Sequence, residues 1–213
     1  MTTVGQTSPR ATYRHGDLRQ ALIEAGLELA REGGPAAVIL RETTRRAGVS
    51  PNAAYRHFAD RRALLDAVCS NCQSLVAIAI EDEQAHQPDA DDPLVRARLQ
   101  LRGVGVGYLN FARAEPGLFQ TAFSASSDLE SATSAARAGN SGLTPFQLLT
   151  AAIDELAAAG GLPPERRLGA EFLAWSSVHG LATLLIDGPL RALPEQFIDQ
   201  LTDRLIDMVE QGL

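Results

Sequence analysis

The sequence contains no lysine, so arginine supplies all 19 basic side chains, and it contains only two cysteines. Cys69 and Cys72 have the C-x-x-C spacing, but a zinc ribbon requires a second such pair. A thioredoxin-like pair would follow a strand, whereas these two residues lie inside a helical pattern. We therefore interpret them as two small buried residues on one helix.

Long apolar runs are also missing. No run approaches the roughly 20 residues that a membrane-spanning helix requires. The opening segment MTTVGQTSPRATYRHGDL lacks the apolar region of a signal peptide. A chain of 213 residues with 45% apolar residues and a mean hydropathy of −0.05 has enough material for a core. We expect a soluble cytoplasmic protein of one large or two small domains, without membrane contact.

Charge is distributed unevenly along the chain. Residues 1–66 carry ten arginines and seven acidic residues, a net charge of +3. The remainder carries nine arginines and nineteen acidic residues, a net charge of −10, which brings the total to −7. The isoelectric point near 5.1 thus hides a basic N-terminal unit joined to an acidic C-terminal one.

Apolar residues recur at the helical period through nearly every long segment, and convincing two-residue alternation is absent. We predict an all-α fold of nine helices in two domains, 14–62 and 63–213, after a flexible tail of residues 1–13. Residues 124–142 are small and polar, so a loop or a weakly held helix is expected there. The expected helices span 17–32, 41–47, 51–58, 61–83, 94–114, 117–123, 145–159, 165–187 and 194–211.

Residues 38–58 have the spacing of a helix-turn-helix motif. Gly48 supplies the turn, Ser50 can cap the next helix with Pro51 at its first position, and Asp60 can cap the helix after that. In such a motif the second helix enters the major groove of DNA with its N-terminal residues at base edges. The free N–H groups at its N-terminus also suit phosphates.

The stretch AGVSPNAAYRHFADRRALL, residues 47–65, resembles the TetR family of bacterial transcription regulators. Members carry Gly-Val-Ser near the turn, then a tyrosine, a His-Phe pair and a basic residue that opens the following helix. The matching residues here are Gly48, Val49, Ser50, Tyr55, His57, Phe58 and Arg61 or Arg62. The likeness is close over residues 14–70, including YRHGDLRQALIEAGLELAREGG, and elsewhere concerns mainly the helix layout.

The resemblance implies a set of DNA contacts. The floor of the groove would meet Ser50, Pro51, Asn52 and Ala53. Phosphates or base edges would meet Tyr55, His57 and Arg61 or Arg62, while Arg41 with Thr43 or Thr44 would brace the DNA backbone. Ala54 and Phe58 would be core residues. Arg45 and Arg46 either contact phosphate or form a solvated face.

Two places depart from the family pattern. Members usually have serine or threonine at the cap of the motif's first helix, where this chain has Ile39. They usually have small apolar residues where it has Thr43 and Thr44. We therefore expect the first turn of that helix to be frayed.

The last two predicted helices, 165–187 and 194–211, have the pattern of a subunit interface. The first carries two apolar stripes, one from Leu168 to Ile186 and one from Ala170 to Leu184, so both sides must be buried. The second has apolar residues at three- and four-residue spacing. Paired around a two-fold axis, these helices would form a four-helix seam, as in TetR-family dimers. We expect a homodimer.

Trp175, His179 and Gly180 resemble the Trp…His-Gly signature of one C-terminal subtype of the family. Trp175 and His179 are four residues apart and share a helix face. Gly180 indicates a close helix approach, because glycine inside a helix costs about 1 kcal/mol relative to alanine. His179 is either a ligand-binding residue or a core histidine at the seam, and the second reading is the commoner one.

Further aromatic residues lie on the helices between the two ends of the chain, where they either line an apolar cavity or simply fill the core. Together with Trp175 and His179, they form the candidate ligand-binding set for a small apolar or amphipathic effector, with residues 124–142 as a gate. They are Tyr108, Phe111, Phe119, Phe123 and Phe146. The glycines of RGVGVGY do not have the spacing of a dinucleotide fingerprint, and no cofactor or metal is expected.

The sequence favours a DNA-binding regulator, by default a repressor that an effector releases from a palindromic operator. An enzyme is disfavoured because the four histidines are scattered and no catalytic or metal-ligand spacing appears. Glu81, Asp82, Glu83 and His86 are better interpreted as a solvated helix end than as a cation site. A helical protein-interaction adaptor is the alternative, and the basic N-terminal unit argues against it.

Overall fold

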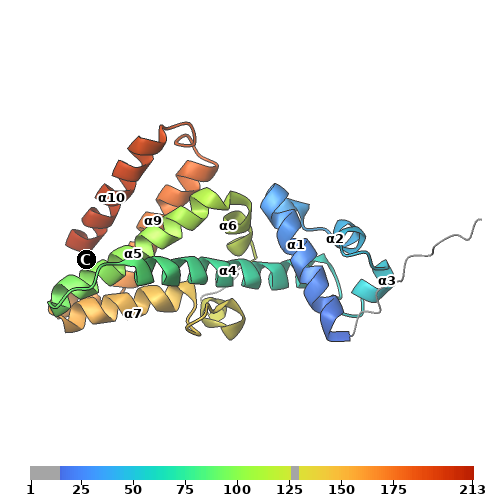
Figure 1. Ribbon diagram of the computed structural model, residues 1–213, viewed down its shortest axis with the longest axis horizontal. Helices are drawn as coiled ribbons and strands as arrows, with labels where there is room; N and C mark the ends of the chain where they lie inside the picture. Colours follow the sequence, from blue (N-terminus) through green and yellow to red (C-terminus); the bar gives the residue numbers. More distant parts are fainter. Residues whose placement is uncertain (1–14, 126–129) are drawn as a thin grey trace, which may run out of the picture.

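The computed structural model describes residues 15–125 and 130–213, and this part of the chain consists of helices joined by loops, without a strand (Figure 1). The predicted all-α class is confirmed. The predicted flexible tail, residues 1–13, lies outside the described residues. The elements are α1 His15–Ala37, α2 Leu40–Arg46, α3 Pro51–Ala54, α4 Arg61–His86, α5 Pro93–Ala114, α6 Pro116–Ala122, η1 Glu130–Thr133, η2 Ala135–Arg137, α7 Pro145–Ala158, α8 Pro164–Arg167, α9 Ala170–Ile186 and α10 Glu195–Gly212.

The predicted count of nine helices is wrong by one, because the expected helix 165–187 is broken at Gly169. Gly169 adopts a φ of +80°, a left-handed conformation that ends the α-helical ladder and that residues with a side chain rarely adopt. The short α8 therefore precedes α9 as a separate turn. Leu168 was expected on an inner stripe, but at this break its side chain is 97% exposed.

Glycine also breaks α1 near its end, as the sequence predicts. Gly33 and Gly34 have non-helical angles, with a φ of +62° at Gly34, and Pro35 opens one further turn that reaches Ala37. α3 and α4 begin after the expected caps, Ser50 and Asp60. Asp60 accepts a hydrogen bond from the Ala63 N–H at 2.8 Å and starts α4.

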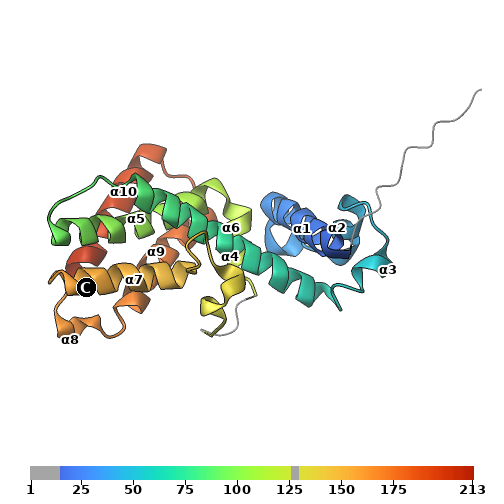
Figure 2. The same ribbon diagram turned by 60° about the horizontal axis from the view of Figure 1, so that its bottom comes forward.

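α4 is the spine of the molecule and runs from the small N-terminal helices into the C-terminal bundle (Figure 2). It packs against α1, α5, α6 and α7. Within the described residues it is the one helix long and apolar enough to cross a membrane, with a mean hydropathy of 1.6 over its most apolar window. The expectation that no segment approaches a membrane span needs this correction. A core helix passes the same test, and 44% of that window is buried here.

The proposed domain boundary at residue 62 falls at the start of α4. Leu64 and Val68 on its first turns are fully buried, and a methyl group added at Gly26 of α1 would lie 2.5 Å from Val68 Cγ2. The first turns of α4 therefore complete the core of the N-terminal unit as well as continuing into the next one.

α6 connects the C-terminal bundle to α1 through an unusually close contact. A Cβ atom at Gly117 would lie 2.3 Å from the carbonyl oxygen of Ala30 and 2.8 Å from that of Arg31. The Arg31 Nε donates to Glu115 at 2.9 Å beside this contact. Only glycine lets the two helices approach to this distance.

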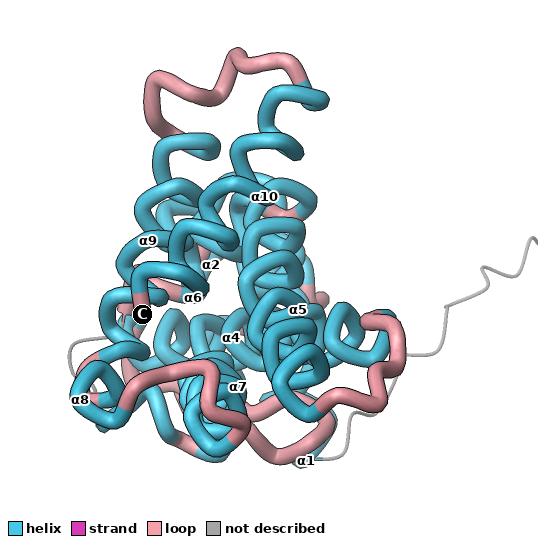
Figure 3. Tube along the Cα trace, turned by 90° about the vertical axis from the view of Figure 1, so that its left-hand side faces the viewer, coloured by secondary structure: helices cyan, strands magenta, loops and turns pink. Residues whose placement is uncertain are grey.

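α10 is held mainly by charge and by one apolar edge. Along α5, Arg98 pairs with Glu210 at 2.9 Å, Arg102 pairs with Asp203 and Asp207, and Arg113 pairs with Asp199 at 2.7 Å. Thr202 and Ile206 are its buried residues. α9 and α10 lie side by side and project from the rest of the bundle (Figure 3).

The expected loop at 124–142 is irregular where it is described, with two short 3₁₀ helices, and residues 126–129 lie outside the described residues. Its last part is fastened to α4. The Glu81 carboxylate accepts hydrogen bonds from the backbone N–H groups of Asn140 at 2.8 Å and Ser141 at 3.0 Å, and Ser74 Oγ donates to the Ala138 carbonyl at 2.6 Å. This segment is therefore anchored at its C-terminal side.

We predict that Gly117→Ala destabilises the protein by about 1–3 kcal/mol, because α6 must move away from α1 to admit the methyl group. Urea unfolding followed by circular dichroism measures the change. Gly212→Ala is the control, because no atom lies within 4 Å of the methyl group that it adds. Equal stabilities of the two variants would contradict the contact.

Candidate functional sites

The helix-turn-helix predicted for residues 38–58 is formed by α2, a turn and α3. Gly48 adopts a φ of +68° in the turn, and the Val49 N–H donates to the Thr44 carbonyl at 3.0 Å. Ser50 Oγ accepts the Ala53 N–H at 3.3 Å, as expected for a cap. α3 spans only Pro51–Ala54 rather than 51–58, and hydrogen-bonded turns continue the chain to the buried Phe58.

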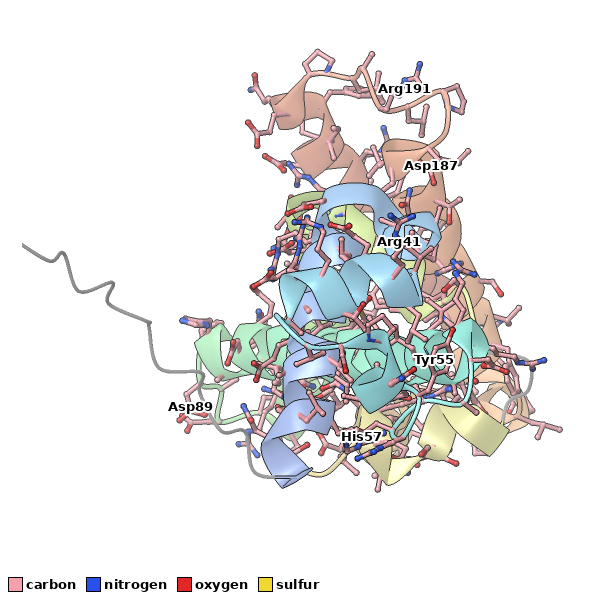
Figure 4. All side chains as sticks on the ribbon, turned by 90° about the vertical axis from the view of Figure 1, so that its right-hand side faces the viewer. Arg41, Tyr55, His57, Asp89, Asp187 and Arg191 are labelled. Atoms are coloured by element: carbon pink, nitrogen blue, oxygen red, sulfur yellow. The ribbon has the colours of Figure 1, made fainter. Side chains whose placement is uncertain are left out.

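The outer side of α3 carries the polar groups expected to reach DNA. Tyr55 is 57% exposed, while Ala54 and Phe58 are buried as predicted. Arg41, Tyr55 and His57 lie at the end of the molecule formed by α2 and α3 (Figure 4). Ser50, Pro51 and Asn52 are also exposed, and Ala53 is half-buried.

Three predicted contact residues face other partners. Thr43 and Thr44 are buried, and their hydroxyl groups donate to the carbonyls of Ile39 and Arg41 at 2.9 and 2.8 Å. The Arg61 guanidinium donates to the carbonyls of Val38 at 2.8 Å and Pro35 at 2.7 Å. The threonines are therefore core residues, and Arg61 ties the start of α4 to the chain before α2.

The hydrogen bonds of Thr43 also show how the first turn of α2, which was expected to be frayed, is held. Ile39 makes no side-chain cap, as expected, yet the Thr43 hydroxyl and the Thr43 N–H both donate to the Ile39 carbonyl. The Thr43 hydroxyl thus stabilises the first turn of α2, which has no side-chain cap. Threonine can stand here in place of a small apolar residue because its hydroxyl has a hydrogen-bond partner.

The arginines near the motif divide into engaged and available groups. Arg45 pairs with Glu42 on the same helix, and Arg46 pairs with Glu32 of α1 at 2.7 Å, which lowers the pKa of that carboxyl. Within the described residues, no ion pair or hydrogen bond engages the exposed side chains of Arg41, Arg56 and Arg62. Arg56 is not among the predicted DNA-contact residues, although its place between Tyr55 and His57 is a sequence signal for such a contact.

Two consecutive hydrogen bonds form a chain in the core of the C-terminal bundle. Trp175 Nε1–H donates to Tyr108 Oη at 3.3 Å, and Tyr108 Oη lies 2.7 Å from His179 Nδ1. A phenol can accept two hydrogen bonds and donate one, so the tautomer of the imidazole sets which of Tyr108 Oη and His179 Nδ1 donates. Burial raises the pKa of Tyr108 and lowers the pKa of His179 below its ordinary 6.5, and both shifts favour the neutral phenol and the neutral imidazole.

Aromatic rings surround this chain. Phe123 lies with its ring centre 4.9 Å from that of His179, and Phe119 lies 5.2 Å from Tyr108. Phe146 contacts Trp175 at 5.7 Å. The six aromatic side chains therefore form one cluster across α5, α6, α7 and α9.

A cavity of about 310 Å³ opens beside this cluster. Of the predicted ligand-binding residues, Tyr108, Phe123, Phe146 and Trp175 line it. Phe119 and His179 line a separate recess of about 190 Å³ together with Phe123. Phe111 borders neither space and packs against the core instead.

The cavity wall also includes aliphatic residues that the search for aromatic side chains missed. Ile206 and Val209 close it from α10, and Leu101 and Val104 line it from α5. The fold brings these positions together. The apolar spacing of α10 indicates that one side of this helix is buried, but not that it borders a cavity. α10 is therefore both a wall of the cavity and an outer helix of the bundle.

The outer sides of α9 and α10 carry apolar groups that no other described residue covers. Leu173 is 65% exposed and Leu184 is 43% exposed, and a Cβ added at Gly180 between them would meet no atom within 4 Å. On α10, Phe197 and Met208 are similarly exposed. The close approach expected at Gly180 therefore does not occur within the chain itself.

The sequence matches two family models. Residues 22–68 match the model of bacterial regulatory proteins of the tetR family, and residues 101–209 match the model of the tetracyclin repressor-like C-terminal domain. No curated protein sequence matches the chain significantly.

Many solved structures share the fold. A protein of unknown function from Rhodococcus sp. RHA1 has 26% identity and a TM-score of 0.72 over 96% of this chain and 99% of its own. A TetR variant from Acinetobacter baumannii AYE, in complex with minocycline, has 18% identity and a TM-score of 0.59 over 91% of each chain. The regulator FadR from Bacillus subtilis, in complex with stearoyl-CoA, has 15% identity and a TM-score of 0.58 over 91% of this chain and 98% of its own.

We predict that His179 makes the protein less stable in acid. Because burial lowers its pKa in the folded state, the unfolded chain binds a proton there that the folded chain resists. The free energy of unfolding should therefore fall as the pH drops through about 6.5, with no contribution from this residue well above it.

Urea unfolding at about pH 7.5 and about pH 5.5 measures this dependence. His179→Gln should lose less stability between the two values than the unchanged protein. His86→Gln removes an exposed imidazole on α4 instead and serves as the control. Equal losses for the unchanged protein and His179→Gln would show that the imidazole is not responsible.

Proposed function

The chain belongs to the TetR family of DNA-binding transcriptional regulators, and we propose that it is a homodimeric repressor released from a palindromic operator by a small effector. The observation that carries the proposal is the separation of roles along α4. Its N-terminal end joins the exposed α3 and three available arginines, and its later turns border an apolar cavity.

The proposed DNA contact centres on α3 and its flanking arginines. Ser50, Pro51, Asn52 and Ala53 enter the major groove at the N-terminus of α3, as in other helix-turn-helix proteins. Tyr55 and His57 contact phosphates or base edges. Arg41, Arg56 and Arg62 contact phosphates, since their guanidinium groups have no partner within residues 15–125 and 130–213. Thr43, Thr44 and Arg61 hold the motif together and are left out of this contact set.

The proposed dimer pairs α9 and α10 of two subunits. The exposed Leu173 and Leu184 flank the uncovered Gly180, and such a small residue between larger ones permits close helix packing. With Phe197 and Met208 of α10, this surface would otherwise leave a large apolar patch in water. The pairing also places two reading helices on one molecule, which a palindromic site requires.

Effector control follows from the position of α6. Phe123, at the C-terminal end of this helix, borders the cavity, and Gly117 at its start lies on the backbone of α1. An effector that favours a different position of Phe123 would shift α6 together with α1 and the helix-turn-helix of α2 and α3. The structurally similar regulators that were solved in complex with minocycline and with stearoyl-CoA support the proposal that this chain binds a small-molecule effector. Operator binding would take place in the cytoplasm, with residues 14–62 as the reading domain and 63–213 as the regulatory one.

Selection of bound sequences from random double-stranded DNA tests the proposal directly. The expected result is a palindrome whose half-site centres lie about 34–36 Å apart, one helical turn of DNA. Binding should weaken steeply with salt because phosphate contacts release counterions. Absence of any selected sequence would favour the protein-interaction adaptor on the same fold.

We predict that Tyr55→Ala weakens operator binding by about tenfold or more, equivalent to roughly 1–3 kcal/mol. The side chain is exposed, so the unfolding midpoint should not change. Gel-shift titration measures the affinity, and Tyr55→Phe separates the ring from the hydroxyl group. An unchanged affinity of Tyr55→Ala would remove this residue from the interface.

We predict that Gly180→Leu converts the dimer to a monomer at micromolar concentration, because the new side chain stands where the partner helix packs. Sedimentation velocity measures the oligomeric state, and circular dichroism checks that helicity is kept. Ala158→Leu, at the exposed end of α7, adds the same bulk away from the seam and should remain dimeric. A dimeric Gly180→Leu protein would place the interface elsewhere.

A further inference from the structure

The wall of the 310 Å³ cavity carries no ionisable side chain other than the Tyr108 phenol, among the residues that the structure describes. Thirteen of its residues are apolar or glycine, and the remaining three are Gln73, Tyr108 and Trp175. The nearest histidine, His179, borders the neighbouring recess rather than this cavity. A ligand in the cavity would therefore meet hydrocarbon, aromatic rings and three neutral polar groups.

The three polar groups already have partners inside the protein. Gln73 Nε2 donates to the Ala122 carbonyl at 2.7 Å. Trp175 Nε1–H donates to Tyr108 Oη, and Tyr108 Oη shares a second hydrogen bond with His179 Nδ1. A ligand can therefore hydrogen-bond only to groups that already have a protein partner.

An ionised ligand would lose its water in this cavity and find no opposite charge. Transfer of an unpaired carboxylate, sulfonate or ammonium group into an apolar space is strongly unfavourable, and weakly basic or acidic groups become neutral instead. Burial raises the pKa of Tyr108, so the phenol is also neutral and supplies no negative charge for a cation. A neutral molecule of the same shape meets no such obstacle.

We propose that the effector of this protein is an uncharged, largely apolar molecule with at most one or two hydrogen-bonding groups, bound beside Tyr108 and Trp175. The inference rests on the proposed effector control and narrows it to one chemical class. Weak acids and bases enter the same class only in their neutral protonation state. Ligands whose permanent charge must enter the cavity are excluded.

Two fluorescent probes with one skeleton test the proposal: neutral N-phenylnaphthylamine and anionic anilinonaphthalene sulfonate. Trp175 is the single tryptophan of the chain and lines the cavity, so quenching of its emission by energy transfer reports binding at this place. The neutral probe should bind the full-length protein at least about 100-fold more tightly than the sulfonate, since the sulfonate alone lacks compensation. Both probes are titrated with and without operator DNA.

Filling the cavity locates the binding. Leu149→Phe on α7 and Leu101→Phe on α5 each add bulk to the wall, and either variant that keeps its helicity and unfolding midpoint should bind the neutral probe at least about tenfold more weakly. Two variants on different helices keep the test usable if one of them does not fold.

The outcomes separate this proposal from the proposed function. Quenching of Trp175 by the sulfonate as strongly as by the neutral probe, lost on filling the cavity, would overturn the neutral class but leave effector control standing. No quenching by either probe would overturn both the ligand class and effector control. Operator binding, measured in the same titrations without probe, tests the DNA-binding function independently of both results.

Discussion

The position of the helix-turn-helix formed by α2 and α3 depends on one contact that has no room for a side chain. At Gly117 the backbone of α6 lies on the carbonyl groups of Ala30 and Arg31, and the Arg31–Glu115 pair closes beside it. The other end of the same seven-residue helix leads into the aromatic cluster through Phe119 and Phe123. A short rigid helix thus touches the N-terminal unit at one end and the cavity region at the other, and neither neighbour can move far without it.

Several polar groups inside the molecule have hydrogen-bond partners within the chain, since a buried donor without an acceptor is costly. The Thr43 and Thr44 hydroxyl groups donate to backbone carbonyls at the start of α2, Arg61 donates to carbonyls at the end of α1 and before α2, and Tyr108 Oη hydrogen-bonds to both Trp175 and His179. These assignments leave the apolar cavity without strong hydrogen-bonding groups of its own. They also leave only a few cations near α3, so the small positive excess of the N-terminal unit is concentrated there.

Sequence reasoning located most of the helices because their signals are local. The caps at Ser50 and Asp60, the glycine turn at Gly48 and the break at Gly33 each act within a few residues of the chain. Partners distant in sequence were not accessible to it. Arg61 donates to carbonyls more than twenty residues away, and Arg46 pairs with Glu32 of α1, so the guanidinium groups of both have partners within the protein. The division of α8 from α9 was missed because Gly169 sits inside an otherwise continuous apolar pattern, and Ile206 and Val209 become cavity wall only through the path of α10.

α10 belongs to two surfaces at once, because Ile206 and Val209 face the cavity while Phe197 and Met208 face outward. Its rows of acidic residues, paired with Arg98, Arg102 and Arg113, hold it to the body less firmly than apolar packing would. In a dimer paired through α9 and α10, subunit association and cavity shape then share one helix. Mass action couples the two equilibria, so the apparent affinity for an effector depends on how much of the protein the cell contains.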